Sequence, residues 1–126
     1  MKEKKFSLCK NCGNLVGSII DSGIPIVCCG QKMEELEPNT VDASQEKHVP
    51  IVSFDDCKIH VEVGAVQHPM TEEHYISFIY VQTENGGMRK KLQPGELPVA
   101  DFYVTNDKPV AVYAYCNLHG LWMTSQ

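Results

Sequence analysis

The sequence lacks an apolar run of the about 18 residues needed to cross a bilayer. Its basic start, Met1–Lys5, is not followed by the apolar segment of a secretory signal. Basic residues are also outnumbered: the net charge is -5, whereas phosphate binding requires a basic surface. We therefore expect a cytoplasmic protein that neither spans a membrane nor binds nucleic acid.

Helix signals are equally scarce, since no long stretch shows apolar residues at helical spacing. Residues 57–63 instead alternate, with apolar and polar side chains on opposite faces: Ile59, Val61 and Val63 against Lys58, His60 and Glu62. Further strand-like segments are separated by turn signals and lie at 48–54, 75–81, 88–92, 102–105 and 110–115. Seven or so short strands predict a β-sandwich for residues 37–126, and an all-β protein as a whole.

The first unit, residues 1–36, contains four of the six cysteines: Cys9, Cys12, Cys28 and Cys29. In a cytosolic chain, such a set favours metal binding over disulfides, and four thiolates suit zinc or a single iron. A unit below about 40 residues rarely folds on a hydrophobic core alone, so a metal would stabilise it. The adjacent Cys28 and Cys29 can reach one ion only if the backbone is distorted there.

Two further expectations concern residues 34–40 and Cys57. We expect residues 34–40, which are polar and include a proline, to form a linker. Cys57 is predicted to be a free thiol at the start of a strand, without a role.

A second candidate site combines a thiol with imidazoles from strand ends and loops: His48, His68, His74, Cys116 and His119. Five such ligands on one ion would leave one coordination position open, whereas structural zinc sites are closed and four-coordinate. The set therefore points to iron. A thiolate opposite the open position would push electron density toward a bound ligand. His60 is excluded, because strand alternation places it on the polar face.

Several motifs together resemble the desulfoferrodoxins, the two-iron class of superoxide reductases. They are Cys9-x2-Cys12, Cys28-Cys29, Glu46-Lys47-His48-Val49-Pro50, His68-Pro69-Met70, Glu73-His74-Tyr75 and Cys116-Asn117-Leu118-His119-Gly120. The resemblance implies a desulforedoxin-like domain holding Fe(Cys)4 in residues 1–36. It also implies an immunoglobulin-like β-sandwich in residues 37–126. There, iron would be held by four equatorial histidines and the axial Cys116.

The resemblance further implies the one-electron reduction of superoxide to hydrogen peroxide, with rubredoxin or a similar carrier as electron donor. Glu46 and Lys47 are interpreted as catalytic: Lys47 would steer superoxide and stabilise the product, and Glu46 would bind the oxidised iron and help expel product. The first centre would relay electrons or hold a homodimer together, and zinc would fit it too. The alternatives are a non-catalytic binding module with a zinc ribbon and a pure electron-transfer protein.

Overall fold

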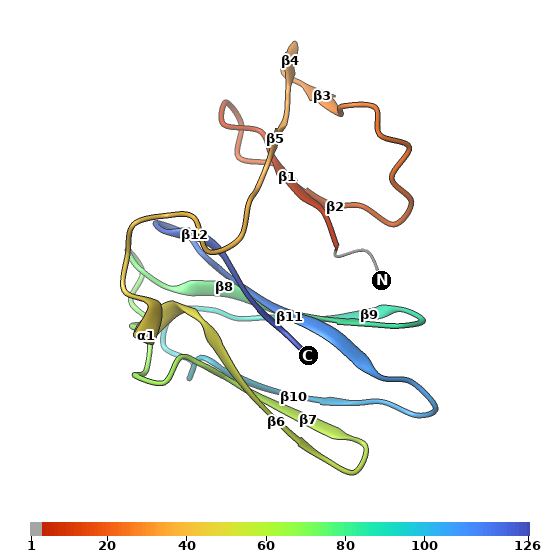
Figure 1. The fold of residues 1–126 in the computed structure, drawn as a ribbon. Helices are drawn as coiled ribbons and strands as arrows, with labels where there is room; N and C mark the ends of the chain where they lie inside the picture. Colours follow the sequence, from red (N-terminus) through yellow and green to blue (C-terminus); the bar gives the residue numbers. More distant parts are fainter. Residues whose placement is uncertain (1–3) are drawn as a thin grey trace. The chain divides into compact units, whose positions relative to one another are not determined.

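The structure is a computed structural model that describes residues 4–126, nearly all of it in short strands and turns. The predicted all-β class is confirmed. The chain divides into two compact units, one ending at Glu37 and the other spanning Pro38–Gln126 (Figure 1). Within the described residues, no helix has the length and apolar character that crossing a membrane requires.

The first unit is built around β1 (Phe6–Leu8), which lies between β2 (Leu15–Gly17) and β5 (Glu34–Glu35) in a three-stranded sheet. A separate hairpin joins β3 (Val27–Cys28) to β4 (Gln31–Lys32). The linker expected from residue 34 is therefore wrong at its start. The side chains of Glu34 and Glu35 are exposed, while their backbone pairs with β1. The polarity of the side chains therefore gave no sign of this strand.

The second unit contains two antiparallel sheets, drawn as two layers in Figure 1. One sheet has the order β10-β7-β6, from β6 (Pro50–Asp55), β7 (Lys58–Val63) and β10 (Val99–Tyr103). The other has the order β12-β11-β8-β9, from β8 (Ile76–Thr83), β9 (Gly87–Lys91), β11 (Pro109–Cys116) and β12 (Gly120–Ser125). The predicted sandwich is present.

The core of this unit follows from the alternation within its strands. Ile59, Val61 and Val63 are buried on one side of β7, as the sequence predicts. On β11 the inward row ends at Cys116, which joins the same buried cluster. Cys116 is therefore the last core residue of β11, and the turn begins at the next residue.

One element differs from expectation next to the predicted site. Residues 48–54 were expected to form one strand, but His48 ends a single-turn helix, α1 (Gln45–His48), and β6 begins only at Pro50. A residue before proline disfavours helical backbone, and Val49 is accordingly extended with φ -72° and ψ 122°. This junction buries His48 and leaves Glu46 and Lys47 exposed.

Candidate metal centres

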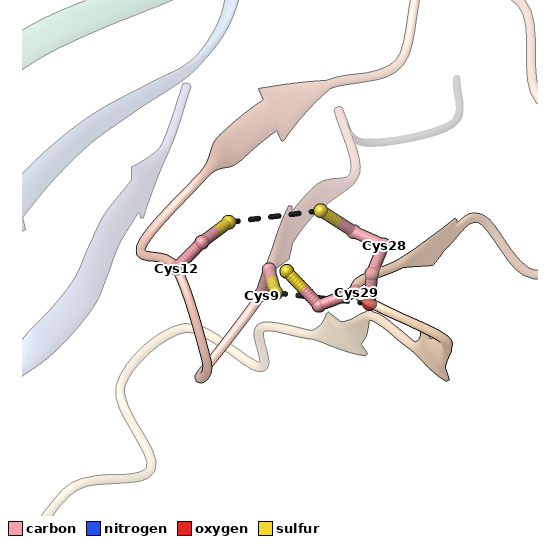
Figure 2. Close-up of side chains that lie close together, drawn as sticks. All are labelled: Cys9, Cys12, Cys28 and Cys29. Carbon is pink, nitrogen blue, oxygen red and sulfur yellow. Dashed lines mark hydrogen bonds between the residues drawn. The ribbon is translucent and has the colours of Figure 1, made fainter.

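The four cysteines of the first unit come together at one point (Figure 2). Their sulfur atoms all lie within 4.8 Å of one another. The backbone is distorted at the adjacent pair as expected, since Cys29 has a left-handed φ of 53° and Gly30 one of 73°. All six cysteines of the chain are free thiols.

Without a metal ion, hydrogen bonds within this cluster make some of the four thiols easier to deprotonate than others. The backbone N–H of Cys12 lowers the pKa of Cys9 to about 7. Hydrogen bonds with Cys12 and Cys9 raise the pKa of Cys28 to about 12. Four thiolates so close together repel one another, and a metal ion removes that repulsion and deprotonates its ligands. The donor set therefore fits a tetrahedral S4 metal site.

The second unit gathers four imidazoles at one end of the sandwich. They come from α1, from the β7–β8 connection and from the β11–β12 turn: His48, then His68 and His74, then His119. Neighbouring rings lie 4.6–5.0 Å apart between centroids and cross at 76–83°. The rings of His48 and His74, which lie across from each other, are 6.2 Å apart and tilted by only 33°. The four rings thus surround a common centre.

The ring nitrogens of this group show which atoms face that centre. Nδ1 of His48 lies 2.6 Å from the Ser44 carbonyl, and Nδ1 of His68 lies 2.7 Å from the Pro69 carbonyl. Because a carbonyl only accepts, each Nδ1 carries the proton and each Nε2 presents a lone pair. The two Nε2 atoms are nevertheless 3.2 Å apart. Facing lone pairs repel, so this contact is not a hydrogen bond, and a cation between them would resolve it.

Two further nitrogens also indicate that a cation would lie at the centre of the four rings. Nδ1 of His119 lies 3.1 Å from Nε2 of His48. Nε2 of His74 is buried without a hydrogen-bond partner in the structure. A buried polar atom without a partner is costly, and a metal ion would satisfy it. These nitrogens fit a site with several imidazole ligands.

Burial favours the neutral form that such a site requires for three of its histidines. It lowers the pKa of His48 and His74, and it lowers that of His68 to about 4. Neutral imidazole is the metal-binding form.

The thiol of Cys116 completes the group. Its ligand atom and those of His48, His68 and His74 all lie within 4.8 Å of one another, and its sulfur is 3.9 Å from Nδ1 of His119. Burial raises the pKa of Cys116, although the backbone N–H groups of Leu118 and His119 act in the opposite direction. A thiolate in this position therefore requires a nearby cation.

The remaining residues singled out in the sequence lie outside these two groups. Glu46 and Lys47 are exposed on α1, directly before His48, and the positive charge of Lys47 helps to lower the pKa of His48 and His74. His60 lies elsewhere on β7 and contacts Asp101. Cys57 is exposed in the β6–β7 turn, not at a strand start.

Two residues without a predicted role contact the imidazole group. Trp122 stacks on His48 with ring centroids 4.8 Å apart, and its indole N–H donates to the His119 carbonyl at 3.1 Å. Asn117 hydrogen-bonds to the backbone on both sides of His74. Both residues lie in or just after the Cys116–Gly120 motif, but nothing in the sequence identifies their distant partners.

Comparison with known proteins agrees with this geometry. The sequence profile of the desulfoferrodoxin family matches residues 40–125. A desulfoferrodoxin homolog of Archaeoglobus fulgidus is 45% identical over 116 residues, which is 92% of each chain. The crystal structure of the superoxide reductase of Treponema pallidum has a TM-score of 0.83 at 34% identity and covers 98% of this chain and 100% of its own. The superoxide reductase (1Fe-SOR) of Giardia intestinalis has a TM-score of 0.53 at 33% identity and covers 65% of this chain and 98% of its own.

Proposed function

The chain belongs to the desulfoferrodoxin family, and on that premise we propose that it is a superoxide reductase. The reaction consumes one superoxide, one electron and two protons and yields one hydrogen peroxide. The observation that carries the proposal is the ring of four imidazoles around a common centre, with the buried thiol of Cys116 beside it. Such a donor set suits a redox-active transition metal.

Two irons per chain complete the proposal. Cys9, Cys12, Cys28 and Cys29 would hold the first, and His48, His68, His74, His119 and Cys116 the second. The second set of residues would hold iron in a position to supply the electron, since iron has accessible ferrous and ferric states. Cys116 is the one anionic ligand among these five, because an imidazole binds a metal ion in its neutral form. A single thiolate leaves a ferrous centre with a net positive charge, which favours an anionic substrate.

Lys47 and Glu46 would act at the entrance to this centre. Superoxide is an anion and the chain carries a net charge of -5, so approach requires a local positive field. Lys47 supplies one, and its exposure on α1 keeps it in contact with solvent, from which protons are drawn. Glu46, exposed beside it, would carry a negative charge that helps to expel the peroxide product.

The first centre would serve electron supply or structure, since four protein thiolates leave no position for substrate. Rubredoxin or a similar small carrier is the proposed electron donor. We propose a cytoplasmic location, because none of the six cysteines forms a disulfide in the structure, which is typical of a reducing compartment. We further propose a homodimer, with the exposed isoleucines of the first unit as its contact.

The experiment that tests the function is a count of products. The iron-loaded, reduced protein is mixed with a pulse of superoxide, and hydrogen peroxide and oxygen are both measured. A reductase gives one peroxide for each superoxide consumed and releases no oxygen. Oxygen release at half the superoxide consumed would instead indicate dismutation. Superoxide decay no faster than in buffer would refute the reductase and favour one of the two non-catalytic alternatives.

A further inference from the structure

Asn117 connects the two loops that carry candidate ligands of the second centre. It lies between Cys116 and His119, in the turn that joins β11 to β12. Its backbone N–H donates to the Tyr75 carbonyl at 3.1 Å. Its side-chain oxygen accepts from the Tyr75 N–H at 2.9 Å, and its side-chain NH2 donates to the Glu73 carbonyl at 2.9 Å. One residue thus binds the backbone on both sides of His74.

The hydrogen bonds of the Asn117 side chain lie where the β11–β8 backbone ladder ends. The β11–β8 ladder pairs Tyr115 with Phe78 and then shifts register, so that Cys116 pairs with Ile76. The side-chain amide of Asn117 has an oxygen acceptor and two N–H donors, and it can pair with backbone groups as a peptide group does. It therefore extends the connection between the two segments beyond the last backbone pair, to the residues that flank His74.

His74 is held differently from two of the other histidines. His48 and His68 are oriented through their rings, since each Nδ1 contacts a backbone carbonyl. His74 is held through its backbone, by a turn in which its N–H lies 3.1 Å from the Thr71 hydroxyl and its carbonyl accepts from the Thr71 N–H at 3.0 Å. Asn117 fixes that turn to the Cys116 loop.

We infer that Asn117 is a positioning residue that holds the imidazole of His74 in place relative to the thiol of Cys116. The inference rests on the proposed second iron centre and adds a residue that does not touch the metal. Groups that orient metal ligands from behind typically contribute 10–100-fold to metal affinity. Of the three hydrogen bonds described here between the β7–β8 loop and the β11–β12 turn, removal of the amide would leave the one from the Asn117 backbone N–H.

The test compares Asn117→Ala with Asn39→Gly in the iron-loaded, full-length protein. Asn39 forms a matching bridge, because its amide donates to the Met123 carbonyl at 3.0 Å and accepts from the Met123 N–H at 2.8 Å. Glycine suits its φ of 64°, so Asn39→Gly removes the same two kinds of hydrogen bond without adding strain. The readouts are the rate of iron release to a chelator, the thiolate-to-iron absorption band of the second centre and the Tm.

We expect both variants to lower the Tm, but only Asn117→Ala to speed iron release from the second centre, by about 10–100-fold, and to shift its band. Asn117→Asp keeps the acceptor for Tyr75 but places an oxygen against the Glu73 carbonyl, so its release rate should be intermediate. If Asn117→Ala does not fold, Asn117→Asp decides by the same readouts.

Two results would overturn the positioning role: wild-type release rate and band in the Asn117 variant that folds, or equal changes in Asn39→Gly. Failure of the proposed function looks different. In that case the wild-type protein itself would lack the band of the second centre or show no reaction with superoxide.

Discussion

The effect of the exposed Lys47 side chain depends on its position next to the second centre. It carries a positive charge in an acidic chain, and α1 places it next to the buried His48. Burial is the main cause of the lowered pKa of His48 and His74, and the positive charge of Lys47 acts in the same direction. An isolated surface lysine would have no comparable influence on an approaching anion.

We predict that Lys47→Gln lowers the second-order rate of superoxide capture by about tenfold at low ionic strength and weakens its dependence on salt. The cause is the loss of the local positive field. Pulsed generation of superoxide with optical detection gives the rate. Lys90→Gln is the matched control, since it removes one charge from an exposed residue of β9. Equal slowing in both variants would mean that only net charge matters.

Trp122 supports the same centre from the core. It is 1% exposed, stacks on His48 and donates to the carbonyl of His119. We predict that Trp122→Phe lowers the free energy of unfolding by about 1–3 kcal/mol, because it leaves a void and removes the indole N–H from a buried carbonyl. Denaturant unfolding of the iron-loaded protein measures this loss. An unchanged midpoint would show that the neighbouring side chains repack without cost.

At the scale of elements, the outer face of the β7–β10 pair carries a network of charges around His60. Its Nδ1 lies 2.6 Å from Asp101, and its Nε2 lies 3.1 Å from Glu62. Lys58 also reaches Asp101, at 3.7 Å. Hydrogen bonding to Asp101 raises the pKa of His60, and the same bond lowers the pKa of Asp101. Both nitrogens of the ring therefore donate when His60 is protonated.

The network predicts a pH-dependent contribution to stability. Because the pKa of His60 is raised above 6.5 on folding, its contribution is complete below pH 6.5 and is lost as the pH rises through the raised value. We predict that His60→Gln lowers the Tm at pH 5.5 and has a smaller effect at pH 9. Thermal unfolding of both proteins at each pH tests this, and comparison at equal pH cancels acid effects on the metal centres. A difference that grows toward pH 9 would contradict the sign.

Not all elements could be read from the sequence with equal success. The strands of the sandwich core were predicted because burial on one face imposes alternation, as Ile59, Val61 and Val63 show. The strand β5 and the helix α1 were missed, because an exposed edge strand and a single helical turn impose no apolar period. The last strand, β12, was missed because its apolar residues Leu121, Trp122 and Met123 are consecutive and show no alternation.

At the scale of the whole molecule, the two units differ in what holds them together. In the described part of the first unit, the buried residues are Phe6 and Cys9, whereas the second unit has an extended apolar core. So small a core cannot offset the entropy lost on folding, and the four-cysteine centre would supply the difference.

We therefore predict that Cys12→Ser removes the first iron and makes the first unit sensitive to protease, while the second centre keeps its absorption band. Limited proteolysis with mass analysis locates the cuts. Cys57→Ser makes the same chemical change at another exposed cysteine and should have no effect. If residues 4–37 stay protected without the first iron, the unit folds without metal, and the centre is more important for electron relay than for structure.

The proposed dimer depends on exposed isoleucines of the first unit. Ile19 and Ile20 of the first unit are 94% and 90% exposed, and Ile24 is 76% exposed. Contiguous exposed apolar side chains mark association surfaces in soluble proteins. We predict a mass in solution of twice 14.1 kDa and a shift toward the monomer in the double variant Ile19→Asp and Ile20→Asp. Light scattering after size exclusion measures this, and a wild-type monomer would refute the dimer.

The donor types, the metal chemistry they suit and the all-β class could be predicted from the sequence, because these depend on residue identity, spacing and alternation. How the donors come together could be seen only in the folded chain. His48, His68, His74 and Cys116 come from separate segments, and no local pattern reports the distance between them. The same holds for Asn117 and Trp122, whose partners Glu73, Tyr75 and His48 are identified only by hydrogen bonds and stacking between distant segments. Long-range contacts depend on how the sandwich packs, which is a property of the whole chain.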